Sequence, residues 1–266
     1  MNHLLRRLLG GLLLVALGLP AAAADCPRIV SQSPHITLAL EWLGRGDCVV
    51  GVSRDDEREL PRTGGVRDPD LGAIGALNPE LIIVSRGTDP ALLDLFEPEA
   101  RVLQVDGFDS MAGTEAMLLS LAEATGVPDA RARVEGYGRD WRAGAAAVRG
   151  GGRRVLVVSA CSAQPYSFGR GHMVGDAFVQ AGFDVVETAE RIRHLRPGEE
   201  VPGIVAAIER FQPELLVSLT PDNAEHCSAE LGLVSVPIVA LEGRHFFHPG
   251  PALLTGFAQL AEQMKQ

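Results

Sequence analysis

The segment "NPELIIVS" at residues 78–85 and the segment "QPELLVS" at residues 212–218 carry almost the same phrase, once in each half of the chain. Each consists of a proline, a glutamate and a short apolar run that ends at a serine. Such a run, bounded by turn-forming residues, is typical of a strand buried on both faces of a parallel sheet. The repeat therefore predicts two similar units that each contain one such strand.

Further short apolar runs alternate with helical patterns throughout both halves, which favours an α/β fold with parallel-sheet cores and helices on both faces. The predicted helices include residues 34–44, 89–96 and 111–126 in the first half, and residues 173–182, 203–211 and 251 onward in the second. The predicted strands are "RIVS" at 28–31, "CVVGVS" at 48–53, "ELIIVS" at 80–85, "RVLQVD" at 101–106, "RVLVVSA" at 154–160, "FDVVET" at 183–188, "ELLVSL" at 214–219 and "PIVALE" at 237–242.

Between the two alternating regions stands one helix-sized segment at residues 127–152, rich in Ala and Arg. Its three internal glycines each cost about 1 kcal/mol relative to Ala in a helix, so its position supports a helix better than its composition does. We expect a connecting helix, followed by a linker at Gly150-Gly151-Gly152. The predicted organisation is thus two Rossmann-like lobes, residues 25–126 and 153–266, joined by this segment.

The amino-terminal 24 residues have the pattern of a secretory signal peptide. Arg6 and Arg7 precede an apolar stretch from residue 8 to residue 19, and small residues at 22–24 supply the cleavage pattern. The apolar stretch is too short for a membrane-spanning helix. The sequence therefore predicts export to the periplasm as a soluble, monomeric protein.

The chain is acidic, with 24 Lys and Arg residues against 34 Asp and Glu residues. Removal of the two leader arginines would leave 22 basic residues and a net charge of −12. Nucleic acid and anionic membrane surfaces would repel such a protein, so neither is expected as a partner. Apolar residues make up 46% of the chain, which is enough for a packed core.

All four cysteines follow the leader, and no C-x-x-C spacing is present. In an oxidising compartment, disulfides are a better interpretation than free thiols or a metal site. Cys26 and Cys48 each precede a predicted strand, and if those strands are parallel neighbours both cysteines lie at the same edge. We therefore expect the disulfides Cys26–Cys48 and Cys161–Cys227.

Ligands of open parallel sheets gather beyond the carboxyl ends of the strands. The loops that follow the predicted strands are polar, with a few arginines and aromatic side chains. The strand-end loops of the two lobes could therefore face each other across a cleft. The candidate ligand-binding residues found in this way are His35, Arg54, Asp55, Arg86, Phe108, Gln164, Tyr166, Asp222, Arg244, His245 and Phe246.

The chain resembles the helical-backbone periplasmic binding proteins, which deliver cobalamin, ferric siderophores or haem to ABC importers. The resemblance rests on "RIVSQSPHITLALEWLGRGDCVVGVS", "ALNPELIIVSRG", "PYSFGRGHMVGDAFVQAGF" and "HPGPALLTGFAQLAEQM", and it extends from residue 28 to the carboxyl end. It implies a ligand held between two lobes that move little on binding. It also implies an inner-membrane permease and ATPase as partners, and a metal chelate as the ligand, with no intrinsic cofactor.

Several positions depart from the cobalamin-binding member of that family. Asp55, Arg67 and Ser85 stand where its aromatic residues would stand, and only Tyr166 is kept. The flat apolar faces of a corrinoid need aromatic or aliphatic partners, so a corrinoid is less favoured. Guanidinium groups instead suit carboxylates and other anionic oxygens. The candidates for anionic contacts are Arg54, Arg67, Arg86 and Arg244, and those for stacking are Phe108, Tyr166 and Phe246.

Members of the family also dock to their importer through one glutamate on each lobe. A local match places Gly72 and Ala206 at those positions in this chain. Carboxylates that could substitute lie nearby at Asp68, Asp70, Glu199 and Glu200. Docking to an importer is therefore implied by the family and not by matching residues.

The sequence also leaves two alternatives to chelate binding. His35 and His245 fall at strand ends of opposite lobes and could jointly ligate a zinc or manganese ion, or the metal of a haem or corrinoid. A secreted hydrolase is the alternative from a different class, and "GVSRD" at residues 51–55 comes nearest to a nucleophile elbow but lacks its final glycine. We therefore expect a binding protein and no catalytic residues.

Overall fold

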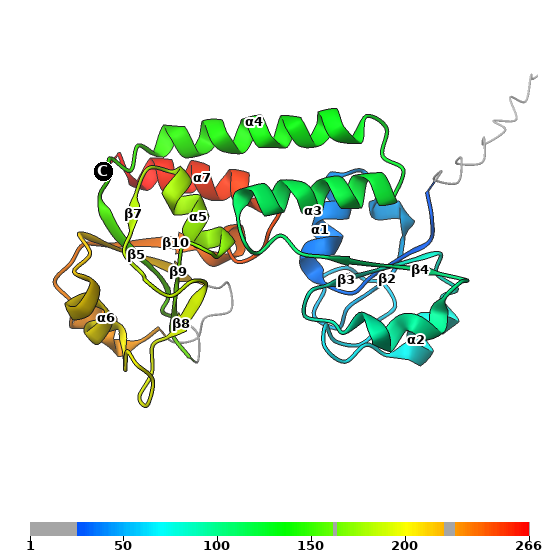
Figure 1. Ribbon diagram of the computed structural model, residues 1–266, viewed down its shortest axis with the longest axis horizontal. Coiled ribbons are helices and arrows are strands. Elements are labelled where there is room, and N and C mark those ends of the chain that lie inside the picture. The colour runs from blue at the N-terminus through cyan, green and yellow to red at the C-terminus, as the bar shows by residue number, and fades with distance from the viewer. Residues whose placement is uncertain (1–25, 162–163, 221–226, 266) are drawn as a thin grey trace, which may run out of the picture.

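The computed structural model describes residues 26–161, 164–220 and 227–265, which form two α/β lobes side by side with a long helix running along both (Figure 1). Residues 1–24, the predicted signal peptide, lie outside the described residues. Within the described part of the chain, no helix is long and apolar enough to cross a membrane.

The amino-terminal lobe contains a four-stranded sheet in the order β2-β1-β3-β4. All neighbouring strands are parallel, as predicted. The strands are β1 (Ile29–Ser31), β2 (Val49–Val52), β3 (Leu81–Ser85) and β4 (Arg101–Val105); the helices are α1 (Pro34–Trp42), α2 (Leu71–Ala76) and α3 (Met111–Ala124). The predicted helix at residues 89–96 is a 3-10 helix, Pro90–Phe96, that begins at the side-chain cap of Asp89.

The carboxyl-terminal sheet is mixed, with the order β10-β9-β5-β6-β8 and β7 paired to β5. The predicted parallel core is present, because β5 is parallel to β9 and β9 is parallel to β10. The sequence did not predict β6 and β8, and β6 runs antiparallel to both β5 and β8. The predicted strand at 183–188 shrinks to the two residues of β7. The strands are β5 (Arg154–Ser159), β6 (Tyr166–Phe168), β7 (Asp184–Val185), β8 (Ile192–His194), β9 (Leu215–Thr220) and β10 (Ile238–Glu242); the helices are α5 (Met173–Gln180), α6 (Ile204–Phe211) and α7 (Ala252–Gln263).

The repeated phrase forms the same structure in each lobe. Asn78 and Gln212 each come directly after a helix, and both adopt the left-handed backbone conformation, with φ of 46° and 47°. The buried strands β3 and β9 come next. An arginine at the amino end of the neighbouring strand holds each turn, Arg28 just before β1 and Arg154 at the first position of β5. Arg28 donates to the carbonyls of Leu77 and Asn78.

In the second lobe, Arg154 donates to the carbonyls of Phe211 and Gln212 in the same way. The glutamate after each proline binds the backbone of the same arginine. Glu80 accepts a hydrogen bond from the backbone N–H of Arg28 at 2.8 Å, and Glu214 accepts one from that of Arg154 at 2.9 Å. The sequence repeat therefore reports a structural repeat at the amino ends of the two sheets.

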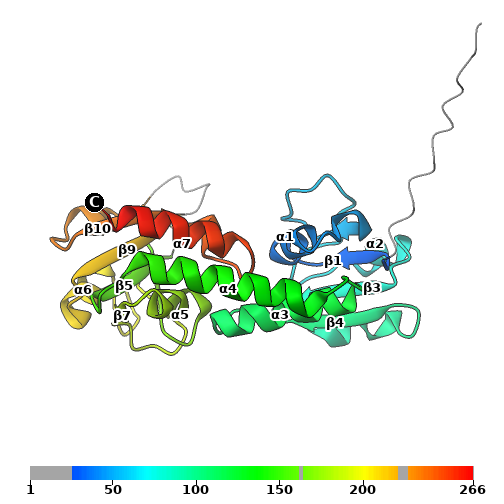
Figure 2. The same cartoon turned by 90° about the horizontal axis from the view of Figure 1, so that it is seen from above.

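Alternate residues of the strands enter different cores, which is the pattern of strands covered on both faces. Leu81 and Ile83 of β3 belong to one large cluster that also contains residues of β5, α3, α4 and α7, and that therefore extends through both lobes. Ile82 of β3 faces a smaller cluster with Ile74 of α2. Leu156 of β5 faces the corresponding cluster with α6. The two lobes are thus packed together on the side that the long helix covers (Figures 1 and 2).

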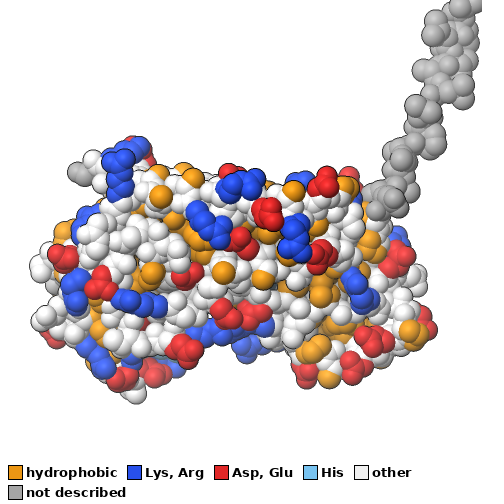
Figure 3. All heavy atoms as spheres, turned by 45° about the horizontal axis from the view of Figure 1, so that its top comes forward, with side chains coloured by type: hydrophobic (Ala, Val, Ile, Leu, Met, Phe, Trp, Pro, Cys, Tyr) orange, Lys and Arg blue, Asp and Glu red, His pale blue; other side chains and the backbone are white. Residues whose placement is uncertain are grey.

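That long helix is α4 (Ala130–Val148), within the segment predicted as the connector. Its buried residues recur at helical spacing and pack on α3 and α7. Tyr137 donates from its hydroxyl to the carbonyl of Gly250 at 3.0 Å, and Trp141 donates to Glu115 of α3 at 2.9 Å. On the outer face of the molecule, basic and acidic side chains are interspersed (Figure 3).

The glycines that weaken α4 by propensity have a packing role at one position. A Cβ added to Gly144 would lie 3.1 Å from Cβ of Phe257 in α7, whereas one added to Gly136 would meet nothing closer than 3.7 Å. Gly144→Leu is expected to lower the free energy of unfolding by about 1–3 kcal/mol through overpacking. Gly136→Leu in the same helix should raise it by up to about 1 kcal/mol. Urea unfolding of both variants tests this, and equal effects would contradict it.

The structure forms two disulfides, Cys26–Cys48 and Cys161–Cys227, which are the two pairings expected from the sequence. The first joins the starts of the parallel neighbours β1 and β2. The second ties the end of β5 to the region after β9. Each disulfide lies within one lobe.

Candidate functional site

A cleft of about 800 Å³ lies between the lobes, at the carboxyl ends of β3 and β5. Ser85 and Ser159, the last residues of those strands, are part of its lining. Its walls carry aromatic and apolar side chains, and its charged lining residues are all arginines. From the amino-terminal lobe come Val66, Arg67, Ser85, Arg86, Gly87 and Phe108, and from the other lobe come Ser159, Tyr166, Phe168, His172, Arg191, Ile192, Phe247 and His248.

Phe108 lies where the two lobes meet. Its ring centroid lies 5.2 Å from that of His35 in its own lobe, and 6.2 Å from those of His172 and His248 in the other. Its carbonyl accepts a hydrogen bond from the backbone N–H of Met173, at the start of α5, at 2.8 Å. The loop between β4 and α3 is therefore held by both lobes.

Three imidazoles surround this ring. His35 stacks on His248, with centroids 5.6 Å apart and an interplanar angle of 9°. Burial lowers the pKa of His35 to about 3, with a further contribution from His248, while Asp106 opposes the shift. Burial likewise lowers the pKa of His172 to about 4, assisted by the cation of Arg86, and burial lowers the pKa of His248. These histidines are therefore neutral at pH 7.

The hydrogen bonds of the histidines fix their rings. His172 caps α5, because its Nδ1 accepts from the backbone N–H of Val174 at 3.1 Å. Nδ1 of His35 lies 2.8 Å from Oγ of Ser33. Its Nε2 is buried and has no hydrogen-bond partner among the described residues.

Arg86 and Arg191 bring positive charge into the cleft from opposite lobes. Arg86 lies 3.0 Å from Asp106 and 3.4 Å from Asp109, and Arg191 forms an ion pair with the same oxygen of Asp109. The backbone N–H of Phe108 and the guanidinium of Arg86 lower the pKa of Asp106, although its partial burial opposes this. Arg67 has no hydrogen-bond or ion-pair partner among the described residues, which leaves its guanidinium available to a ligand.

Of the residues predicted from the sequence, Arg67, Arg86, Phe108 and Tyr166 lie in the lining of the cleft, and His35 lies directly behind Phe108. Asp222 lies outside the described residues.

The other predicted residues have different surroundings. Arg54 is exposed and pairs with Asp68 and with Asp55, which are exposed as well. Gln164 accepts from Arg196. Arg244 pairs with Glu242, and His245 lies 3.6 Å from the same carboxylate. These residues are not in the lining of the cleft.

Two predictions need correction. Phe246 cannot form a stacking wall, because it is completely buried in the core, with its ring 5.9 Å from that of Phe178. The histidine that meets His35 across the lobes is His248 and not His245. Among the described residues, no group of three or more His, Cys, Asp or Glu side chains is placed to hold a metal ion.

Sequence reasoning missed Phe168, His172, Arg191, Phe247 and His248. The sequence signal for Phe247 and His248 was weak. They follow His245 and Phe246 in the loop after β10, and the strand pattern does not determine which residues of that loop point into the cleft. Phe168 lies in β6 and Arg191 directly precedes β8, and the sequence analysis predicted neither of these strands. A signal for His172 was present, because it directly precedes the helical pattern at 173–182.

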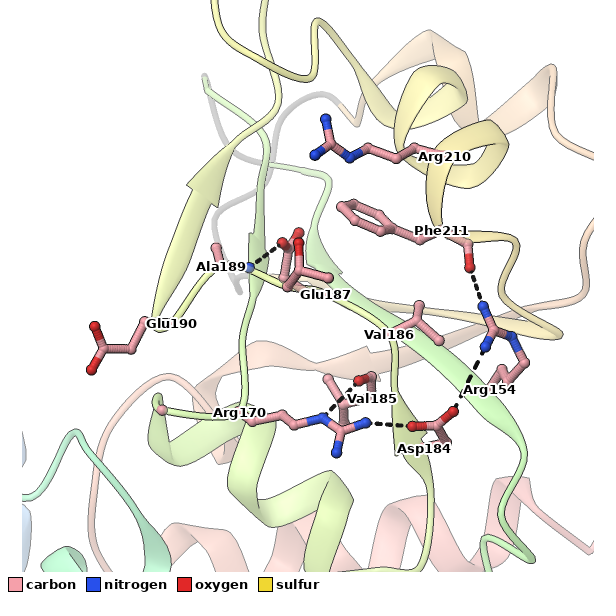
Figure 4. A pocket seen from close by; sticks show the side chains of 12 residues that line it. Arg154, Arg170, Asp184, Val185, Val186, Glu187, Ala189, Glu190, Arg210 and Phe211 are labelled. Carbon is pink, nitrogen blue, oxygen red and sulfur yellow. Dashed lines mark hydrogen bonds and ion pairs between the residues drawn. The ribbon is translucent and has the colours of Figure 1, made fainter.

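A second hollow, of about 770 Å³, lies wholly in the carboxyl-terminal lobe, beside the amino end of β5 (Figure 4). Its arginines are already partnered. Arg154 and Arg170 both pair with Asp184, and Arg210 pairs with Glu200. Glu187 is buried and accepts from Ser167, Ala189 and Arg193. This hollow is therefore a less suitable ligand site than the cleft between the lobes.

Comparison with known proteins agrees with this geometry. A family model described as "Periplasmic binding protein" matches residues 33–200. No curated protein sequence matches the chain. Among solved structures, the periplasmic haem-binding protein HutB of Vibrio cholerae has a TM-score of 0.75 at 18% identity, with 90% of this chain and 99% of that chain covered.

Two further structures have the same fold. The periplasmic haem-binding protein RhuT from Roseiflexus sp. RS-1 has a TM-score of 0.69 at 22% identity, covering 89% of this chain and 98% of that chain. The periplasmic vitamin B12 binding protein BtuF of Vibrio cholerae has a TM-score of 0.69 at 18% identity, covering 90% of this chain and 97% of that chain. The family model matches more than half of the sequence, and the chain therefore belongs to the periplasmic binding protein family, in the helical-backbone type that the sequence resembles.

Proposed function

We propose that this protein binds an anionic metal chelate between its two lobes and delivers it to an ABC importer. The observation that carries this proposal is the charge of the cleft. Its charged lining residues are Arg67, Arg86 and Arg191, although the chain as a whole has a net charge of −10. Positive charge gathered in a large inter-lobe cavity of an acidic protein favours an anionic ligand.

The shape and walls of the cleft suit a large ligand with a conjugated ring system. Its volume of about 800 Å³ falls within the range of small-molecule sites, roughly 300–1,000 Å³. Phe108, Tyr166, Phe168 and Phe247 offer aromatic faces and edges. Haem combines a flat apolar macrocycle with two carboxylates, and guanidinium groups bind carboxylates through paired hydrogen bonds.

Haem and an anionic ferric chelate fit this lining better than a corrinoid does. The similar structures include proteins for haem, for vitamin B12 and for a complex of two acinetobactin molecules with ferric iron. The periphery of a corrinoid is largely uncharged amide, which gains little from three arginines. Directly bound zinc or manganese is less favoured, because cationic side chains would repel it.

Delivery to an importer is proposed from the family. The helices α2 and α6 precede the repeated strands, and the positions that match the family's docking glutamates are Gly72 on α2 and Ala206 on α6. The nearby carboxylates already have partners within the chain. Asp68 pairs with Arg54, Asp70 caps α2, Glu199 pairs with Arg196, and Glu200 pairs with Arg193 and Arg210.

Titration of the purified protein with haemin, a ferric catecholate, cyanocobalamin and zinc tests the proposal. We expect haemin or the ferric catecholate to bind with a Kd of about 1 μM or below, equivalent to about −8 kcal/mol. Absorption spectra and calorimetry would report binding. Tight binding of cyanocobalamin or zinc alone would contradict the proposal.

A further inference from the structure

Asp109 connects the cationic groups of the two lobes. It lies in the loop between β4 and α3, next to Ser110, which caps α3. Its Oδ1 is 3.4 Å from Nη1 of Arg86 and is also in ion-pair contact with Nη2 of Arg191. One carboxylate oxygen thus lies between a guanidinium of the amino-terminal lobe and a guanidinium of the carboxyl-terminal lobe, both of which line the cleft.

Asp109 is held less firmly than its neighbour Asp106. Asp106 accepts a backbone hydrogen bond from Phe108 at 2.9 Å as well as one from Arg86 at 3.0 Å. The Asp109 side chain is 63% exposed, and ion pairs of exposed side chains contribute little to stability. A competing carboxylate could therefore displace Asp109 without disturbing the loop.

Arg191 has hydrogen-bonding capacity that Asp109 does not use. Its Nε is buried and has no hydrogen-bond partner among the described residues, whereas its Nη2 is already in ion-pair contact with Asp109. Buried donors without acceptors are costly. A ligand carboxylate that replaced Asp109 at Nη2 and also reached Nε would satisfy both nitrogens, which gives the ligand an advantage over Asp109.

We propose that Asp109 is an internal counter-ion. In the ligand-free protein it occupies an anion subsite between Arg86 and Arg191, and the acidic group of the incoming ligand takes its place. This inference rests on the proposed function and assigns the class of group that binds at this position, a carboxylate. It also makes Asp109 a specificity-determining residue, because a ligand without an acidic group leaves the counter-ion in place.

The experiment compares Asp109→Asn with the wild type, using haemin and haemin dimethyl ester as probes. Asp109→Asn should bind haemin about fivefold more tightly, since it no longer competes as an anion. The dimethyl ester lacks the carboxylates, so its affinity should change by less than about twofold. Asp68→Asn is the matched control: Asp68 pairs with Arg54 on the same lobe but outside the cleft lining, and this variant should bind haemin like the wild type.

A ligand-free measurement separates this inference from the proposed function. Amide hydrogen exchange at residues 190–194 should be faster in Asp109→Asn than in the wild type, because the inter-lobe ion pair is lost. Unchanged exchange, or haemin affinity that is unchanged or lower in Asp109→Asn, would overturn the counter-ion role. Failure of the wild type to bind either haemin or a ferric catecholate would instead overturn the proposed function.

Discussion

Arg86→Ala is expected to weaken haemin binding by about 10- to 100-fold. A charge-assisted hydrogen bond contributes roughly 1.5–3 kcal/mol, and each 1.4 kcal/mol is a factor of ten in affinity. The substitution also leaves Asp106 and Asp109 without the guanidinium that they share. Their two negative charges would then repel an anionic ligand, so the loss exceeds that of a single contact.

The fold should tolerate this change, because Arg86 is 41% exposed and its ion pairs lie at the cleft surface. Arg54→Ala provides the matched control: it also removes an arginine paired with aspartate in the same lobe, but one outside the cleft lining. Calorimetry should show wild-type affinity for Arg54→Ala. Arg86→Lys should be intermediate, since an ammonium keeps the charge and loses the paired geometry. Equal affinities of wild type and Arg86→Ala would remove Arg86 from the site.

Acidification is expected to destabilise the protein by about 5 kcal/mol between pH 6.5 and pH 4. Burial lowers the pKa of His35 to about 3 and that of His172 to about 4, whereas an unfolded chain protonates histidine near pH 6.5. The unfolded state therefore binds more protons as the pH falls through 6.5. The free energy of unfolding is therefore unaffected by the titration of these two imidazoles above pH 6.5. Below pH 6.5 it falls by roughly 1.4 kcal/mol per pH unit for each of them.

Asparagine variants separate the two histidines. Asn places a polar atom near the position of Nδ1, so it can keep the contact of His35 with Ser33 and the cap that His172 provides for α5. Each single variant should remove about half of the steepness of the stability curve between pH 6.5 and pH 4. Chemical unfolding at a series of pH values measures this slope. A slope that stays the same in both variants would show that other groups cause the acid sensitivity.

The fold was largely predictable because its strongest signal is local and occurs twice. The prolines at 79 and 213 each follow a left-handed residue, and the apolar runs behind them are long enough to identify buried strands. The β6–β8 ribbon was missed for the opposite reason. Each of its strands has only three residues, and strands this short carry too few positions to establish a period.

The site was predictable only where it follows directly from a strand. Arg86 follows the last residue of β3, and Phe108 lies three residues beyond β4, so the strand-end rule found both. Arg191 reaches the cleft from the loop before an antiparallel strand, to which that rule does not apply. Phe246 was assigned to the wall in place of Phe247, its neighbour in the same loop. Phe246 is buried in the core and Phe247 lines the cleft, and the sequence does not say which of the two points inward.

The order of the cysteines along the chain has a consequence for biogenesis. The first pairs with the second across 22 residues, and the third pairs with the fourth across 66. An oxidase that joins thiols in the order in which they leave a translocation channel would form both native bridges directly. Oxidation in that order would leave no wrong pairing for an isomerase to correct, because each cysteine pairs with the one adjacent to it in the order 1–2 and 3–4.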